Sequence, residues 1–329
     1  MTDRAQAADW SGPTLSIRPP RDYLLSRDVC SYGYFMLPPN RWVVAEQMME
    51  RAIDVGGSAV GVRVRQPSRK AGGVIRVKCD RGVTEVERKL VRDGVRRMLR
   101  LNETAESIAD FHRVDPRWRK TGEGRLYRSP TLFEDVIKTV TNCNVTWPGT
   151  IRMNRRLCDV FGAKSASGIR AFPTAAKLAR TRPGTLRARC SLGYRDQRTV
   201  DLAKMFVRGE IEVDLIEDRG TPDDEVFAYL KTLPGIGPFA AGNIMMLLGR
   251  YSRMAIDTES YRHGRTVLGM EGTPRELHKQ VAAHFEKFGE HKFRSYWFEL
   301  WKWYETKRGP AELWDRDAVG DSLTASQFD

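Results

Sequence analysis

The sequence predicts an α+β protein, in which an N-terminal antiparallel sheet is followed by a mostly helical bundle. Alternating apolar and polar residues mark strands in the first third of the chain, and from Thr131 onward apolar residues recur at helical spacing. With 329 residues, the chain is about twice the usual length of one domain. We expect a sheet with a helix over residues 12–110, a helical domain over 111–310 and a flexible tail over 311–329.

Two strands and a helix are predicted in the first region. Apolar residues alternate with polar or small ones over 60–65 and again over 75–79, and the polar segment 66–72 lies between them, which indicates an antiparallel hairpin. Thr84 and Glu87 have the spacing of a capping box, and the apolar residues after them repeat at helical spacing. A helix of about four turns with an Arg-rich outer face is therefore expected after the hairpin.

The second region reads as a series of helices separated by proline and glycine. The aromatic segment 293–304 is also helical in pattern, and we expect it to lie against the rest because so apolar a helix cannot stand alone in water. The other helical segments are 132–140, 151–161, 175–179 and 199–206.

The charge of the chain favours an anionic partner. The 55 Lys and Arg residues exceed the 42 Asp and Glu residues, which gives a formal charge of +13 and suits nucleic acid or a membrane surface. Residues 160–195 contain no acidic residue, so they form either a phosphate-tracking face, which we favour, or an ordinary solvated surface. The basic residues of this run are Lys164, Arg170, Lys177, Arg180, Arg182, Arg187, Arg189 and Arg195.

The sequence gives no sign of secretion, membrane insertion or a cysteine-held metal. Its N-terminus lacks the charged-then-apolar order of a signal peptide, and no apolar stretch reaches the roughly 18 residues that span a bilayer. The five cysteines are scattered without metal-ligand spacing. We expect a soluble protein in a reducing compartment, without disulfides.

A helical hairpin is predicted around residues 233–237. Thr221 supplies a capping hydroxyl and Pro222 the first helical position of one helix, and a second helix begins after the sequence Leu-Pro-Gly-Ile-Gly. Gly235 and Gly237 leave consecutive amide groups uncovered at the start of the second helix, where they can face an anion. A DNA phosphate fits this turn, and the alternative is an ordinary tight helical hairpin.

Asp257 follows an apolar run twenty residues after Gly237 and begins another helix. A carboxylate placed this way beside a phosphate-binding hairpin resembles the helix-hairpin-helix (HhH-GPD) DNA glycosylase superfamily; the alternative is a helix N-cap with no further role. Residues 133–162 and 192–195 are similar to segments of the eukaryotic 8-oxoguanine glycosylases. Together with a TBP-like N-terminal sheet, which bacterial 3-methyladenine glycosylase II also has, the resemblance covers about 15–304.

The resemblance implies a role for each matching residue. Asp257 is the catalytic carboxylate, Asn144 fills the space left by an extruded nucleotide, Tyr194 is the wedge in the opposite strand, and Arg195 contacts the orphaned base. No cofactor is expected, although hairpin carbonyls bind a monovalent cation in many members of the superfamily. The matching carbonyls are those of Leu233, Gly235 and Ile236, and the other expected DNA contacts are Gly235, Ile236, Gly237, Phe239, Arg187 and Arg189.

Departures from the superfamily pattern narrow the expected activity. Phe239 stands where bifunctional members have the lysine that attacks the sugar, which implies a monofunctional hydrolase. Gly149 replaces the second cytosine-reading arginine of the 8-oxoguanine enzymes, and Glu259 replaces their histidine. No cysteine follows Cys190, so the iron–sulfur loop of the endonuclease III branch is missing.

The resemblance as a whole implies a monomeric base-excision-repair enzyme that acts on double-stranded DNA. It would reside in the cytoplasm or nucleoid, or in the nucleus of a eukaryote. Alkylated or deaminated purines rank ahead of oxidised guanine as substrates, because aromatic side chains attract electron-poor purines. Two alternatives remain open: 8-oxoguanine glycosylase activity, and a non-catalytic DNA-binding protein with the same hairpin.

Overall fold

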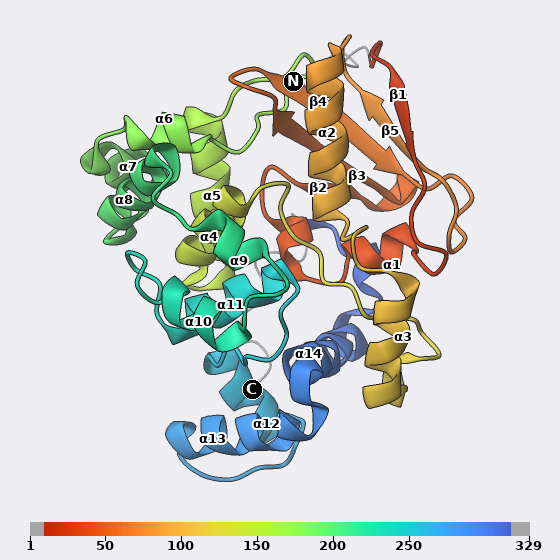
Figure 1. Ribbon diagram of the computed structural model, residues 1–329, viewed down its shortest axis with the longest axis vertical. Helices are drawn as coiled ribbons and strands as arrows, with labels where there is room; N and C mark the ends of the chain where they lie inside the picture. The colour runs from red at the N-terminus through yellow and green to blue at the C-terminus, as the bar shows by residue number, and fades with distance from the viewer. Residues whose placement is uncertain (1–9, 317–329) are drawn as a thin grey trace, which may run out of the picture.

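A five-stranded antiparallel sheet forms the N-terminal part of the chain, as predicted. The computed structural model describes residues 10–316, and the sheet lies at one end of the molecule (Figure 1). The predicted hairpin is β4 and β5, in which Val62 lies opposite Cys79 and Val64 opposite Val77. The strand order is β1-β5-β4-β3-β2, with β1 Thr14–Ile17, β2 Arg41–Val43, β3 Met48–Asp54, β4 Ala59–Arg65 and β5 Ile75–Cys79.

The predicted amphipathic helix is α2 (Glu85–Met98), which lies across the sheet (Figure 1). Its capping box is present: the amide of Glu87 donates to the Thr84 hydroxyl at 3.2 Å, and the Glu87 carboxylate accepts from the Thr84 amide at 2.9 Å. Val91, Val95 and Met98 are buried on one face. The local sequence therefore determines both where this helix begins and which face it buries.

The rest of the chain is mostly helical, and every predicted helical segment lies in a helix. The predicted and observed helices differ most at their N-termini. The helix α5 begins at Trp147, four residues before the predicted start, and has Pro148 in its first turn; α8 also begins four residues early, at Arg195. The other helices are α1 Leu25–Val29, α3 Ala105–Val114, α4 Leu132–Asn142, α5 Trp147–Phe161, α6 Ala175–Ala179, α7 Pro183–Cys190, α8 Arg195–Arg208, α9 Val213–Glu217, α10 Asp223–Leu230, α11 Pro238–Leu248, α12 Thr258–Thr266, α13 Pro274–Phe285 and α14 Lys292–Arg308.

Two large hydrophobic cores hold most of these elements, and a small third cluster contains Ala52, Ala59 and Ala171. One contains the buried faces of the sheet and α2 together with the aromatic helix α14, and the other lies among α4 to α11. The first core thus contains residues from Leu15 to Trp314 and joins the N-terminal sheet to α14. The helix α3 crosses the predicted domain boundary at residue 110. Trp297 and Trp301 pack in this core, where their indole groups donate to the carbonyls of Ser31 and Cys30.

The prediction of a flexible tail from residue 311 is wrong for its first residues. Ala311 and Trp314 are buried, and the Trp314 ring lies 5.1 Å from that of Trp301. A tryptophan so close to the aromatic helix gains more from burial than the short segment loses in conformational freedom. The remainder of the predicted tail, 317–329, lies outside the described residues.

A buried polar cluster joins the N-terminal region to the helices. The Tyr32 hydroxyl donates to the Asn243 side chain of α11 at 2.6 Å, and that amide donates to Thr139 of α4 at 3.0 Å. The Tyr34 hydroxyl lies 2.9 Å from the same threonine oxygen. Because buried polar groups are costly without partners, these contacts fix the segment around residue 33 against both helices.

No helix in the described part of the chain is long and apolar enough to cross a membrane.

Candidate DNA-interacting site

The predicted hairpin is formed by α10 and α11, with residues 231–237 as the turn. Gly235 has φ +78°, and a Cβ there would lie 2.6 Å from Cδ of Arg198, so both backbone and space require glycine. Gly237 is the N-cap of α11, and nothing lies within 4 Å of the position a Cβ would take. The amide end of α11 is therefore open to an approaching anion.

One detail of the predicted hairpin is wrong. The residue before α10 is Pro222, which has no side chain that can cap, and the Thr221 hydroxyl lies 3.5 Å from the Asp218 carboxylate instead of on α10. The helix begins one residue later than expected, and Asp223 and Asp224 in its first turn take up the interaction with its positive end.

Phe239 and Lys231 lie on either side of the turn. Phe239 is half-buried in the first turn of α11 and packs against the core that contains the sheet. Lys231 points back along α10, with its ammonium nitrogen 5.1 Å from the centre of the Phe227 ring. Lys231 therefore does not place its amine near position 239, where the bifunctional enzymes have their lysine.

Asp257 lies at the N-terminus of α12, as predicted. One of its carboxylate oxygens accepts hydrogen bonds from the amides of Glu259 at 3.0 Å and Ser260 at 3.1 Å, and the Ser260 hydroxyl lies 3.3 Å away. The Ser260 hydroxyl also accepts from the Asp257 amide, which completes a capping box. The carboxylate is therefore held rigidly by one oxygen, and its second oxygen has no hydrogen bond to another described residue.

The pKa of Asp257 is raised to about 6, because burial and the charge of Glu259 raise it by more than the hydrogen bonds from Ser260 and Glu259 lower it. The Glu259 carboxylate is turned aside, because it contacts Arg262 and the hydroxyl of Tyr304. Asp257 is thus an aspartate whose charge is poorly solvated near neutral pH, which is common where a carboxylate takes part in chemistry.

Three residues that the sequence did not single out surround Asp257. The Tyr296 hydroxyl lies 3.0 Å from that of Ser260, and His278 donates to the Asp257 carbonyl at 2.9 Å. The charge of Asp257 also helps to raise the pKa of Tyr32, although burial is the larger cause. These residues come from α14, α13 and the N-terminal region, so no local spacing could have linked them to Asp257.

The structure brings together Asn144 and Tyr194, which are fifty residues apart. Asn144 has φ +50°, and its side-chain amide donates to the Tyr194 hydroxyl at 3.3 Å. Tyr194 is 48% exposed, which is unusual for a large aromatic residue and is consistent with a surface that receives a partner. The family resemblance implied that both residues enter the opened duplex, and the structure places them side by side.

Arg195 is held beneath this pair and is 7% exposed. Its guanidinium donates to the carbonyl of Asn144 at 3.0 Å and to that of Cys143, and its Cζ lies 4.4 Å from the centre of the Tyr194 ring. The group therefore supports the turn that carries Asn144. A contact between Arg195 and an orphaned base remains a prediction, and it requires some of these hydrogen bonds to be exchanged.

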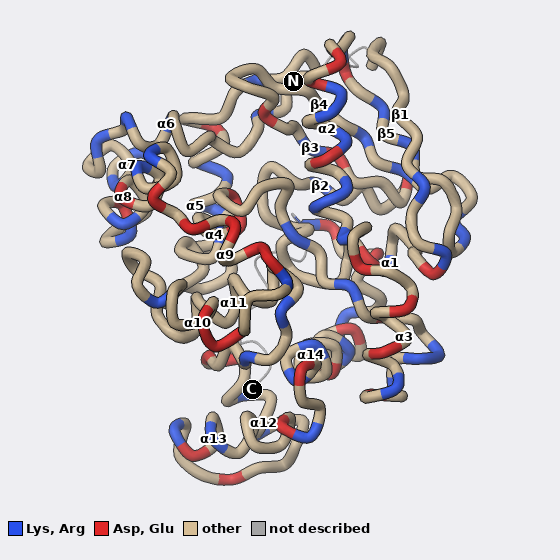
Figure 2. The backbone as a smooth tube through the Cα atoms, viewed as in Figure 1, with Lys and Arg blue, Asp and Glu red and all other residues tan. Residues whose placement is uncertain are grey.

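The basic run of residues 160–195 covers α6, α7 and the loop before them, where Lys and Arg are frequent (Figure 2). Arg182 and Arg189 are exposed. Arg187 is exposed too, but its Nε donates at 2.9 Å to Asp196, which is buried. Arg187 thus has a structural partner that the sequence did not reveal, and its part in DNA binding remains a prediction.

Trp147 packs against the segment around Gly33. A Cβ at Gly33 would lie 3.0 Å from the indole of Trp147, so this tryptophan rests on the glycine backbone. Trp147, Phe239, Met254 and Trp297 are all partly buried against the same core. Trp147 comes from the first turn of α5, three residues after Asn144, and this proximity was the sequence signal that could have identified it.

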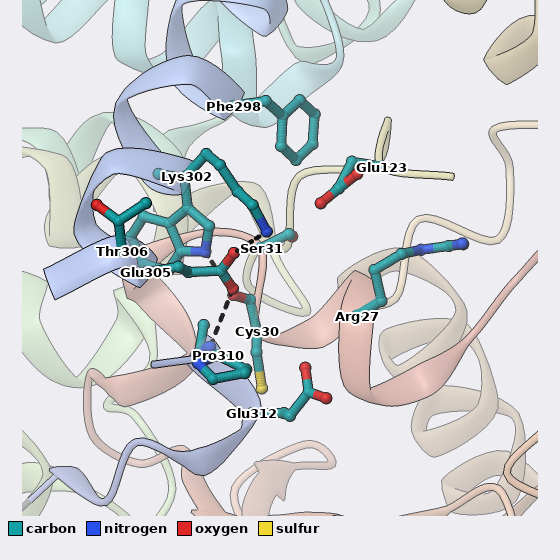
Figure 3. Close-up of a pocket in the computed structure, with 12 residues that line it drawn as sticks. Arg27, Cys30, Ser31, Glu123, Phe298, Lys302, Glu305, Thr306, Pro310 and Glu312 are labelled. Atoms are coloured by element: carbon teal, nitrogen blue, oxygen red, sulfur yellow. Dashed lines mark hydrogen bonds and ion pairs between the residues drawn. The ribbon is translucent and has the colours of Figure 1, made fainter. Parts of the chain in front are cut away.

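Two pockets among the described residues lie away from Asp257 and the hairpin. Figure 3 shows one of about 330 Å³, where side chains of α14 meet Cys30 and Glu312. Its carboxylate Glu305 is engaged by Lys302 at 3.1 Å and by the amide of Ala311 at 3.0 Å. The other, of about 560 Å³, lies between β2 and α5. Neither pocket therefore belongs to the candidate site around Asp257 and the hairpin.

No protein-family profile and no curated protein sequence matches the chain. Solved structures do match it. The 3-methyladenine DNA glycosylase of Archaeoglobus fulgidus has a TM-score of 0.66 and 19% identity, and the match covers 88% of this chain and 99% of that one.

Two structures of the 8-oxoguanine glycosylase/lyase of Clostridium acetobutylicum are also similar. The apo form has a TM-score of 0.64 and 22% identity, over 87% of this chain and 94% of that one. The complex with double-stranded DNA containing cytosine opposite 8-oxoguanine has a TM-score of 0.60 and 18% identity, over 84% and 93%. At these identities the matches show that the chain has the helix-hairpin-helix glycosylase fold.

Proposed function

We propose that this chain, which has the helix-hairpin-helix glycosylase fold, is a monofunctional DNA glycosylase of base excision repair. It would bind double-stranded DNA as a monomer, extrude a damaged purine and hydrolyse its N-glycosidic bond. The observation that carries the proposal is Asp257, a half-buried carboxylate with a raised pKa, fixed at the N-terminus of α12. A residue that served only as a cap would have no need of such burial.

Asp257 acts on the charge that develops on the sugar. As the base departs, the deoxyribose gains positive charge, and an ionised carboxylate held nearby stabilises it. The amides of Glu259 and Ser260 fix one oxygen of Asp257, so little reorganisation is required when the charge appears. The other oxygen orients or deprotonates the attacking water.

The absence of lyase activity is proposed from Phe239. A lyase of this fold needs an amine two residues after the second hairpin glycine, where it attacks the sugar and forms a Schiff base. Phe239 has no nucleophilic atom, and Lys231 points away along α10. Water is therefore the nucleophile, and the product is an intact abasic site.

Extrusion is assigned to Asn144 and Tyr194. The exposed Tyr194 ring stacks into the strand opposite the lesion, and the Asn144 amide hydrogen-bonds in the space that the base leaves. Gly235 and Gly237 present backbone amides to a phosphate, Ile236 lies between them with its amide bonded to the Leu233 carbonyl, and Phe239 follows in the first turn of α11. Arg187 and Arg189 add charge on α7.

Alkylated or deaminated purines are the proposed substrates. Trp147 and Phe239, both partly buried against the core, offer the aromatic surfaces that attract electron-poor or cationic bases. Gly149 supplies no side chain to read an opposite cytosine, and a Cβ there would meet Val145 at 2.6 Å, so the helix has no room for an arginine without rearrangement.

No cofactor is proposed for the reaction, but a monovalent cation at the hairpin fits the residues present. The Leu233 carbonyl accepts the Ile236 amide at 3.1 Å, and a carbonyl oxygen has a second lone pair. Leu233, Gly235 and Ile236 would hold the ion, which would add positive charge where a phosphate binds.

A panel of duplexes tests the proposed function. Each contains hypoxanthine, 1,N6-ethenoadenine, 3-methyladenine, uracil or 8-oxoguanine, and released base is measured by mass spectrometry. We expect release of at least one altered purine by the wild-type protein and none by Asp257→Asn. Release of 8-oxoguanine alone would favour the alternative substrate, and DNA binding without release of any base would favour a non-catalytic protein.

A further inference from the structure

We propose that Arg198 is a positioning residue that couples the Tyr194 wedge to the hairpin turn, so that binding of a phosphate at the turn sets the wedge in place. The inference rests on the proposed function, because it assigns Tyr194 to the opened duplex. Arg198 belongs to neither feature in sequence: it lies in the first turn of α8, thirty-seven residues before Gly235.

The first contact of Arg198 is with the hairpin. A Cβ on Gly235 would lie 2.6 Å from Cδ, and 3.3 Å from both Cγ and Nε, of Arg198. The aliphatic stem of the arginine therefore lies directly on the turn between α10 and α11. Gly235 is needed at this position partly because the Arg198 side chain occupies the space that a larger residue would take.

The second contact is with the wedge. The Cζ atom of Arg198 lies 5.0 Å from the centre of the Tyr194 ring, within the range of a cation–π interaction. Arg195 also contacts this ring, but its guanidinium is bonded to the carbonyl groups of Cys143 and Asn144. Arg198, by contrast, forms no ion pair with any described residue. Arg198 is therefore the side chain that reaches from the turn to the wedge.

This arrangement has a consequence for the order of events on DNA. A phosphate drawn to the amide end of α11 also meets the charge of Arg198, which is exposed. The guanidinium, planar and shared between phosphate and ring, then holds the Tyr194 ring in the direction of the duplex. A lysine would keep the charge but would lose the flat contact with the ring.

The test separates wedge insertion from excision. Duplexes contain a non-cleavable abasic analogue with 2-aminopurine opposite it, and stopped-flow fluorescence follows unstacking when the wild-type protein or a variant binds. We expect Arg198→Ala to slow unstacking about 3- to 10-fold and to reduce the salt slope of binding by about one unit. Arg198→Lys should restore the salt slope but not the unstacking rate.

Arg208→Ala is the matched control, because Arg208 is exposed at the other end of α8 and pairs with Glu210. It should behave as the wild type, with an unchanged Tm in all three variants. The proposal is overturned if Arg198→Lys unstacks the base as fast as the wild type, or if Arg198→Ala equals Arg208→Ala in both measurements. Failure of the wild-type protein to unstack any duplex would instead count against the proposed function.

Discussion

The side-chain amide of Asn144 donates to the hydroxyl of Tyr194 at 3.3 Å, although fifty residues separate the two. Asn144 lies in the turn between α4 and α5, and Tyr194 immediately precedes α8. Arg195 joins them from below through the Asn144 carbonyl and the Tyr194 ring. Two loops that would enter a duplex from different strands are thus connected before DNA arrives.

This connection predicts how truncations behave. Tyr194→Ala and Asn144→Ala should slow excision from a matched duplex more than from a mismatched or single-stranded one, because the wedge supplies unstacking energy that a weak pair does not require. Single-turnover rates on the three substrates measure this. Equal losses on all of them would assign these residues to folding or general binding.

Arg195 should give a different pattern. If its guanidinium reads the orphaned base, Arg195→Ala changes the preference among opposing bases as well as the excision rate. If it serves only the Asn144 turn, the variant repeats the behaviour of Asn144→Ala with every opposing base. Rates against all four opposing bases distinguish these results, and the second would remove Arg195 from the DNA contacts.

Loss of the Asp257 charge should abolish chemistry without weakening binding. Asn can accept the same capping hydrogen bonds, so Asp257→Asn keeps the start of α12 and removes only the charge. We expect single-turnover excision to fall at least about 100-fold, as on loss of one preorganised electrostatic group, with unchanged duplex affinity. Full activity in the variant would contradict the catalytic assignment.

The same substitution should stabilise the protein at neutral pH. The folded pKa of Asp257, about 6, lies above its ordinary value of 3.8, so the folded state holds this proton more tightly than the unfolded state. The ionised carboxylate therefore costs stability above pH 6, on the order of 1–3 kcal/mol, and the cost disappears as the pH falls below 4. Denaturant unfolding of both proteins at pH 7.5 and pH 4 should show a much smaller difference at the lower pH.

Excision should depend on pH with a midpoint near 6. Only the ionised Asp257 stabilises a cationic sugar, so the rate should fall about tenfold per unit below that pH. Ser260→Ala removes a hydroxyl that lowers the pKa of Asp257, and should move the midpoint upward. A single-turnover profile from pH 4.5 to 8 at constant ionic strength tests both, and a flat profile would mean that another group limits the rate.

The product DNA should contain intact abasic sites. Since Phe239 cannot form a Schiff base, strands should break only after alkali, and borohydride should trap no covalent complex. Lys231→Ala should leave both results unchanged, because this lysine lies against Phe227. Efficient trapping by the active wild-type protein would overturn the monofunctional proposal.

The basic run is best tested away from Arg187. Removal of Arg187 leaves the buried Asp196 carboxylate without its ion pair, so a loss of DNA binding could reflect lost stability. Arg182→Ala and Arg189→Ala alter exposed residues, and each should reduce the salt slope by about one unit on damaged and undamaged duplex alike. An unchanged slope would mark this run as ordinary surface.

The sequence alone determined the elements whose signals are local. The capping box at Thr84, the alternation over 60–65, the glycines of the hairpin and the N-cap position of Asp257 all depend on neighbours within a few residues. The local prediction was wrong at the start of α10, which begins at Asp223, one residue later than Thr221 and Pro222 indicated.

The contacts between distant residues depend on the tertiary structure. The raised pKa of Asp257 results chiefly from burial, and Arg187 forms an ion pair with Asp196. Trp314 packs in the core that also contains the N-terminal sheet. The positions of Arg195 and Arg198 around Tyr194 likewise depend on packing between distant segments. Burial and charge pairing depend on all the residues that are close in space. The spacing of apolar residues along a sequence predicts which face of a helix is buried, but it does not identify the residues that cover that face.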